Sequence, residues 1–193
     1  MAQKKLLIGK DVIDFWKYME SQYRFIVVEK ADSKAMEKIS WVLDAMGILD
    51  HKEFMANFTT TLGRVVYVPF DIGVGNQRQL LSQVETCVHE AEHVVQYMRN
   101  RAKFVWKYVT SDASRSHYES EAYLTNMEMH FYLTGKLLGA KSLSGLLESY
   151  GVGEDDIRVT YKQLTIASKL VKRGAVISNT SKTAIKYLKA KGF

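Results

Sequence analysis

The chain has 193 residues, of which 47% are hydrophobic and 25% charged, a composition typical of a soluble globular protein with one sizeable core. Its formal net charge of +6 comes entirely from residues 151–193, which hold nine Lys and Arg against three Asp and Glu, whereas residues 1–150 hold eighteen of each. The sequence excludes a transmembrane span, because no apolar run approaches ~18 residues, and an internal disulfide, because Cys87 is the single cysteine.

The two ends of the chain lead to expectations about the localisation of the protein and its binding partners. At the N-terminus, two lysines precede only three apolar residues, which is too short for a signal peptide, so we expect a cytoplasmic protein. At the C-terminus, the excess of positive charge could meet an acidic protein partner or a larger assembly. No RNA- or DNA-binding motif accompanies that charge, so we expect neither a nucleic-acid partner nor a membrane partner.

The first part of the chain predicts a helix, a strand and a second helix. Residues 11–22 place four apolar side chains on one helical face, namely Val12, Phe15, Trp16 and Met19. The β-branched run 24–30 predicts a strand. A helix is then expected from an N-cap at Asp32 or Ser33 to a stop at Gly47.

Two strands are expected in residues 54–70, around a turn at Leu62 and Gly63. Because Pro69 cannot donate a hydrogen bond to a β-ladder, the second strand should be an edge strand or end at this residue.

A long helix is predicted next, from Gln77 to about Arg99. Asn76 precedes it and is a residue type that caps helix N-termini. Cys87 lies on the apolar stripe of this helix, so we interpret it as a core residue and not as a ligand or nucleophile.

The rest of the chain predicts helices only. They are expected over residues 116–138, 142–150, 154–172 and 180–190. Helix, strand, helix, strands and then helices is the order of an α+β fold, in which a small sheet with an edge strand packs on a largely helical body.

The sequence His89-Glu90-Ala-Glu-His93 lies inside the long helix. An α-helix turns by 100° per residue, so the two histidines project from one face and can bind one zinc ion. Glu90 lies beside the first ligand, where it can take a proton from water and pass it to a leaving group. Chance would produce the pattern in about one of a hundred shuffled chains of this composition.

An open catalytic zinc site needs a third protein ligand, which must come from outside this helix. The candidates downstream are Glu119, Glu121, Glu128 and His117. We favour Glu119, because its helical stripe includes Ala122, and a small residue one turn away lets two helices approach closely. Glu121 is the second choice, because its stripe, with Thr125 and Glu128, has the character of a solvated face.

The motif His89-Glu90-x-x-His93, followed by Glu119-x-x-Ala122 on a second helix, resembles the zincin metallopeptidases. More narrowly, it is similar to the branch whose third zinc ligand is a glutamate. The resemblance implies a zincin-like fold, zinc as the cofactor and peptide hydrolysis as the activity. It also implies that an edge strand before the motif helix lines the substrate cleft, and residues 63–69 are similar to that strand in position.

The sequence departs from the family's pattern at one position and leaves a second role without a unique residue. The family's Glu-x-x-Ala usually continues with an aspartate that orients a ligand histidine, and this chain has Tyr123 instead. The family also uses a tyrosine or histidine to stabilise the oxyanion of the tetrahedral intermediate. The candidates for that role are His117, Tyr108 and Tyr123, and the sequence does not choose among them.

Together these observations predict a zinc metallopeptidase that acts on a peptide or protein substrate. Residues 1–150 would form the zincin-like metal-binding domain, and residues 151–193 a basic helical extension packed on it. The alternative is a non-enzymatic module that keeps the zincin fold for structure or assembly, for example in a viral particle. Tyr123 and the basic C-terminal region favour the alternative, whereas Glu90 argues against it, because a purely structural metal site has no use for a general base.

Overall fold

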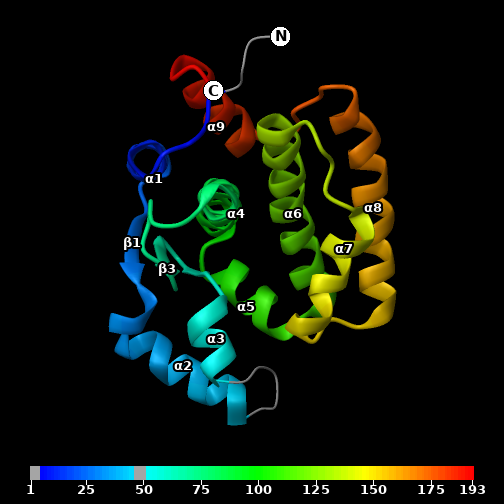
Figure 1. Cartoon of the computed structure of the whole chain (residues 1–193). Coiled ribbons are helices and arrows are strands. Elements are labelled where there is room, and N and C mark those ends of the chain that lie inside the picture. The colour runs from blue at the N-terminus through cyan, green and yellow to red at the C-terminus, as the bar shows by residue number, and fades with distance from the viewer. Residues whose placement is uncertain (1–4, 46–50) are drawn as a thin grey trace.

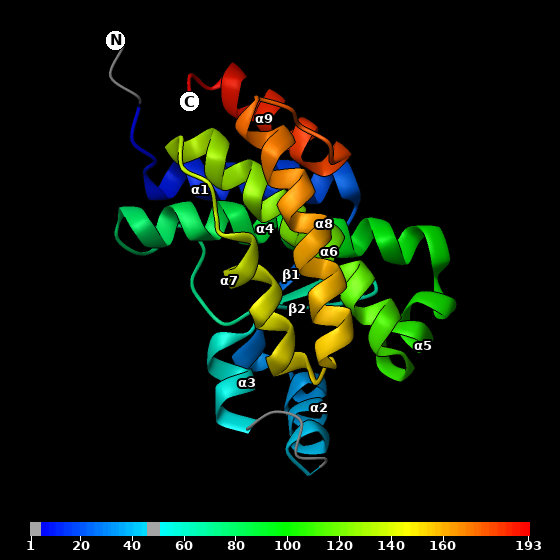
Figure 2. The same ribbon diagram turned by 90° about the vertical axis from the view of Figure 1, so that its right-hand side faces the viewer.

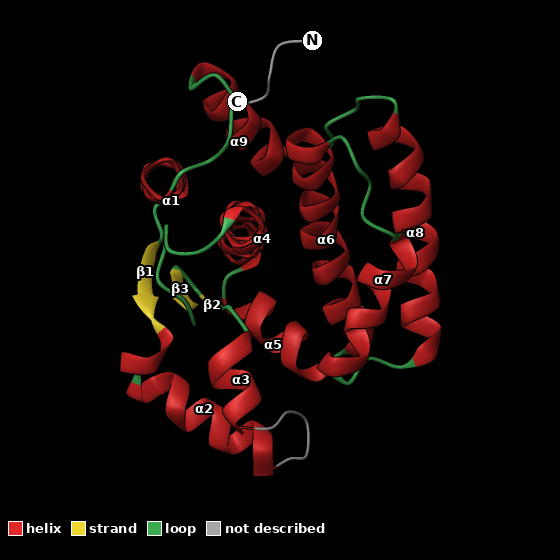
Figure 3. Cartoon of the chain, in the orientation of Figure 1, coloured by secondary structure: helices red, strands yellow, loops and turns green. Residues whose placement is uncertain are grey.

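The computed structural model of the chain describes residues 5–45 and 51–193, and their fold is mostly helical with one small sheet (Figure 1, Figure 3). The elements are α1 (Gly9–Tyr23), β1 (Ile26–Glu29), the 3-10 helix η1 (Lys30–Asp32), α2 (Lys34–Ala45), α3 (His51–Asn57), β2 (Thr60–Leu62), β3 (Val65–Val68), α4 (Gln77–Asn100), α5 (Ala102–Thr110), α6 (Asp112–Thr134), α7 (Ala140–Gly145), the 3-10 helix η2 (Leu146–Tyr150), α8 (Glu154–Lys172) and α9 (Asn179–Ala190).

Most of the predicted elements are confirmed, and the α+β class with a small sheet on a helical body is correct. The predicted stop at Gly47 lies outside the described residues. Residues 54–57 were expected to open a strand, but they end helix α3. No described helix combines the length and the apolar character that a membrane span requires.

The described sheet has the strand order β1-β3-β2. β2 and β3 are antiparallel and joined by the turn at Gly63, as predicted, and β3 ends at Val68, directly before Pro69. β1 pairs with the other side of β3 in parallel, with Ile26 opposite Val65. The expectation that 63–69 is an edge strand is therefore wrong: β3 is central, and β2 is the edge strand that contacts α4.

Helix α4 occupies the centre of the molecule, between the sheet and α6 (Figure 1). Asn76 caps it, because its side chain accepts a hydrogen bond from the backbone of Gln79 while Gln79 reaches back to the backbone of Asn76. The apolar stripe of α4 is buried against α1, the sheet and α9, and Cys87 lies in this core, as predicted.

Helix α6 is covered on both sides, by α4 and by α8, which lies across it in Figure 2. Thr125 and Glu128 are therefore buried, and the expectation that they belong to a solvated face is wrong. The Glu128 carboxylate accepts hydrogen bonds from the backbone N–H groups of Ile177 and Ser178, at the start of α9. Burial raises the pKa of Glu128 in spite of these bonds.

The side chain of Lys30 is fully buried and stabilises the C-terminal end of α3. Its Nζ donates to the carbonyls of Phe54 and Phe58, both at 2.7 Å, and lies 3.0 Å from the Thr60 hydroxyl oxygen. The carbonyls at the end of a helix have no partner inside it, so a buried lysine supplies the donor that the helix lacks. This contact explains why residues 54–57 end a helix and do not begin a strand.

Burial lowers the pKa of Lys30 from 10.5 to about 7. Between these two values the unfolded chain binds a proton that the folded chain does not, so the free energy of unfolding should rise with pH in this window. We expect the increase from pH 7 to pH 9.5 to be smaller in Lys30→Met than in the wild type by at least about 1 kcal/mol. Urea unfolding at both pH values measures it, with Lys52→Met, at an exposed position of α3, as the control. Equal increases in wild type and Lys30→Met would contradict the assignment.

Candidate metal centre

His89 and His93 lie on the face of α4 that meets α6, with their Nε2 atoms 3.2 Å apart. Each ring is held through Nδ1 by a side-chain amide: His89 by Asn126 at 2.6 Å and His93 by Gln96 at 2.9 Å. The amide oxygen only accepts, so Nδ1 carries a proton in each ring, and when both rings are neutral the lone pair of each Nε2 faces the space between them. This is the tautomer that metal binding through Nε2 requires.

The orientation of Gln96 is fixed by its own partners. Its Nε2 donates to the backbone carbonyl of Tyr118 at 2.9 Å and to Glu121 Oε2 at 3.0 Å, which turns Oε1 toward His93. The side-chain amides of Asn126 and Gln96 thus orient the two histidines, a role for which the sequence offered no carboxylate. Gln96 follows His93 by three residues and Asn126 follows Glu119 by seven, so helical spacing alone could have suggested them.

Glu119 supplies the third donor group from α6. Its Oε1 lies 3.4 Å from His93 Nε2, and its Oε2 lies 3.7 Å from His89 Nε2. The ligand atoms of the three residues all lie within 4.8 Å of one another, so this group could hold a metal ion. Glu119 is 1% exposed, yet its Oε2 has no hydrogen-bond partner within the described part of the chain.

The charges in the centre are strongly coupled. Burial opposes the negative charge of Glu119, but the neighbouring histidines outweigh it and lower the pKa of the carboxyl to about 2. Burial likewise opposes the positive charge of His93, but Glu119 outweighs it and raises the pKa of the imidazole to about 9. A cation between these side chains would replace the proton as the source of positive charge.

The other third-ligand candidates lie elsewhere. The Glu121 side chain is 37% exposed and engages Gln96, and His117 is 60% exposed and lies 3.9 Å from Glu121. Glu128 is occupied by the backbone at the start of α9. Of the predicted candidates, Glu119 alone is brought to the two histidines.

Glu90 is 4% exposed and accepts a hydrogen bond of 2.6 Å from the hydroxyl of Thr61. Thr61 belongs to the edge strand β2, so the sheet fixes one oxygen of the carboxylate beside the histidines. Local sequence carries no signal for this contact, because the two residues are 29 positions apart and on different elements.

The two tyrosines proposed for oxyanion stabilisation both reach the centre, whereas His117 does not. Tyr108, on α5, donates to Glu119 Oε1 at 2.6 Å. The Tyr123 ring lies 5.6 Å from that of His89, and its hydroxyl is buried without a hydrogen-bond partner among the described residues. Burial raises the pKa of both phenols, so each remains a protonated donor near neutral pH. Tyr123 is thus the tyrosine whose donor is not already used.

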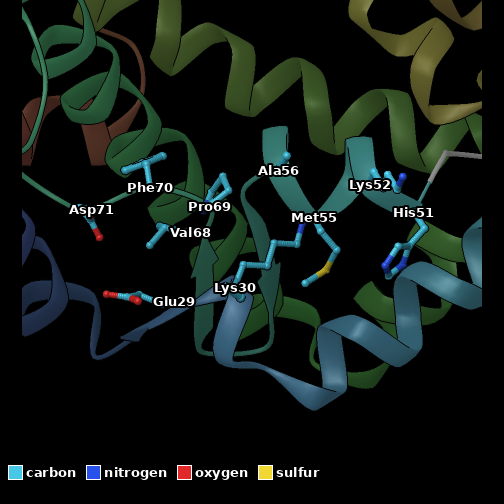
Figure 4. Close-up of a pocket in the computed structure, with 11 residues that line it drawn as sticks. Glu29, Lys30, His51, Lys52, Met55, Ala56, Val68, Pro69, Phe70 and Asp71 are labelled. Carbon is cyan, nitrogen blue, oxygen red and sulfur yellow. The ribbon is translucent and has the colours of Figure 1, made fainter.

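A hollow of about 510 Å³ lies between the end of the sheet and α3 and is separate from this centre (Figure 4). Figure 4 shows Lys30 running toward Met55, with Glu29 and Asp71 at one end. None of its lining residues belongs to the His89, His93 and Glu119 group. Its size therefore does not identify it as the place where metal chemistry would occur.

The amide partners lead to a prediction for Asn126. Replacing Asn126 with alanine removes the acceptor that orients His89, and we expect zinc affinity to fall about 10- to 100-fold. Asn126→Asp keeps an acceptor at the same place and should stay within a few-fold of the wild type. Competition with a chromophoric zinc chelator measures both. Unchanged affinity in Asn126→Ala would show that the hydrogen bond does not orient the ligand.

No protein-family model matches the chain, and the comparisons with curated proteins and with solved structures find no match either. The resemblance to the zincins therefore rests on the motif and on the group that His89, His93 and Glu119 form.

Proposed function

We propose that the protein is a zinc-dependent metallopeptidase, in which His89, His93 and Glu119 hold the metal and Glu90 is the general base. The observation that carries the proposal is the convergence of three ligand atoms from two helices to within 4.8 Å, with a buried carboxylate next to them in sequence.

The donor set suits zinc. Two imidazole nitrogens and one carboxylate oxygen are typical of a catalytic zinc site, which keeps a further coordination position open. The unpartnered Glu119 Oε2 supports the fit, because a buried carboxylate oxygen without a donor is rare unless a cation belongs beside it. When bound, zinc supplies Lewis acidity that makes water a nucleophile near neutral pH and polarises the carbonyl of the scissile bond.

The chain's own groups then move the protons and stabilise the developing charge. Glu90 accepts a proton from the attacking water and delivers it to the leaving amine. Thr61 holds one oxygen of Glu90, which leaves the other free for this transfer. Tyr123 would stabilise the oxyanion, which its buried hydroxyl supports because it has no hydrogen-bond partner among the described residues.

Hydrolysis of labelled casein tests the proposed activity. We expect cleavage by protein loaded with zinc, loss of cleavage after treatment with a chelator, and recovery when zinc is restored. Cleavage that persists in chelator-treated protein free of metal would contradict a metallopeptidase. One bound zinc without hydrolysis of casein or of a mixed peptide library would contradict the catalytic assignment but not the metal site.

A non-enzymatic assembly module remains the second candidate, and the C-terminal region favours it. Residues 157–193 contain nine Lys and Arg and no acidic residue. Helix α8 also exposes Val159, Ile166 and Leu170 beside some of these charges. Such a face suits an acidic protein partner in a larger assembly. Zinc-dependent hydrolysis that requires Glu90 would decide for the enzyme.

A further inference from the structure

We infer that a hollow of about 390 Å³ on the far side of α4 binds the phosphate group of a small organic molecule. The hollow, called here the arginine hollow, lies between the end of α1, the β2–β3 turn and the end of α4. It is lined by Gln22, Tyr23, Arg24, Arg64, Val94, Val95, Met98 and Arg99.

The lining carries three positive charges and no negative one. Within the described part of the chain, none of Arg24, Arg64 and Arg99 has an ion pair, whereas Arg115 and Arg158 pair with aspartates. The C-terminal ends of α1 and α4 contribute partial negative charges of about −0.5 each, which leaves a net charge of about +2. A phosphate dianion matches this charge, and guanidinium groups bind it through paired hydrogen bonds.

The backbone of Arg24 gives independent support. This residue ends α1 in the left-handed conformation, with φ 55° and ψ 45°. Glycine or asparagine is the usual residue at such a position, because a side chain there is strained. Arg24 therefore combines a strained backbone with a place in the lining of the hollow, and strain of this kind clusters at ligand sites.

The apolar side chains that line the hollow indicate that the ligand also has an apolar part. Val94, Val95 and Met98 are its apolar lining residues, and Met98 is partly open to solvent. The guanidinium of Arg64 contacts the Met98 sulfur through Nη2 at 2.8 Å and Nε at 3.0 Å, which holds the charge over the apolar surface. A lining that combines arginines with apolar side chains suits an organic phosphate better than a bare ion.

The arginine hollow is distinct from the metal centre. On α4, Val95 and Arg99 are about 160° and 120° away from His93 around the helix axis, so they point in other directions than the His93 ring. None of the residues of the metal centre lines the hollow. The inference therefore does not depend on the proposed peptidase activity, and each can fail without the other.

Calorimetric titration of chelator-treated protein in 150 mM NaCl tests the inference, with phenyl phosphate, inorganic phosphate and benzoate as probes. We expect saturable binding of phenyl phosphate, weaker binding of inorganic phosphate and the weakest binding of benzoate. The Kd for phenyl phosphate should rise at least tenfold in Arg64→Gln and in Arg99→Gln. Arg24→Gly should weaken binding similarly without lowering Tm, because glycine suits the left-handed backbone.

Arg78→Gln is the matched control, because it removes the same charge from an exposed position in the first turn of α4. Its Kd should stay within twofold of the wild type, and so should that of Glu119→Gln, which alters only the metal centre. No saturable binding by the wild type would overturn the inference. An equal loss in Arg78→Gln would reduce it to general charge attraction, and a loss in Glu119→Gln would place the anion at the metal centre; either result overturns the assignment.

Discussion

Glu119→Gln is expected to abolish stoichiometric zinc binding while the protein stays folded. The amide has the shape of the carboxylate and can still accept the hydrogen bond from Tyr108, but it offers the metal no negative charge. Because the loss of a group that only orients a ligand already weakens binding about 10- to 100-fold, loss of the ligand's charge should exceed 100-fold. Elemental analysis of purified protein should find one zinc in the wild type and almost none in the variant.

Glu121→Gln is the matched control for this experiment. It makes the same change two residues away on the same helix, at a side chain that is 37% exposed and outside the group of three. It should keep one zinc. Loss of zinc in Glu121→Gln alone would show that the third ligand has been assigned to the wrong carboxylate. If the wild type holds no zinc even after zinc is supplied, the motif does not bind metal in this protein, and the assembly module is favoured.

Glu90→Gln is expected to keep one zinc and to lose hydrolysis. Glutamine can still accept the hydrogen bond from Thr61, so the local structure should survive, but an amide cannot accept a proton from water. A positioned general base contributes about 10²- to 10⁴-fold to the rate, so kcat should fall by that factor. Casein or peptide cleavage measured together with zinc content separates the loss of catalysis from the loss of metal.

Glu85→Gln controls for the removal of a carboxylate from α4. Glu85 is five residues earlier on the helix, one turn before His89, where it pairs with His130 at 2.8 Å and is not part of the His89, His93 and Glu119 group. This variant should retain both zinc and hydrolysis. Hydrolysis at the wild-type rate by Glu90→Gln would disprove the role of Glu90 as the base, even if zinc is required.

The spacing of residues in the sequence was sufficient to predict the properties that depend on neighbouring residues along one helix. The apolar stripe predicted α4 and the burial of Cys87, and Asn76 predicted where that helix begins. His89 and His93 share a face because the α-helix itself sets the rotation between them. The alanine one turn after Glu119 favoured that residue over Glu121, and the structure places Glu119, not Glu121, in the group with the two histidines.

Contacts between distant elements were decided by tertiary structure alone. β3 became the central strand because β1, almost 40 residues earlier, pairs with it, and no local pattern records that pairing. Thr61 meets Glu90 only because the edge strand packs against α4, and Thr125 and Glu128 are buried only because α8 and α9 cover α6. Sequence periodicity specifies which side chains share a face of one element. Which other element covers that face is decided by the packing of the whole chain. This packing brings Glu119 to the two histidines and gathers Arg24, Arg64 and Arg99 around another side of α4.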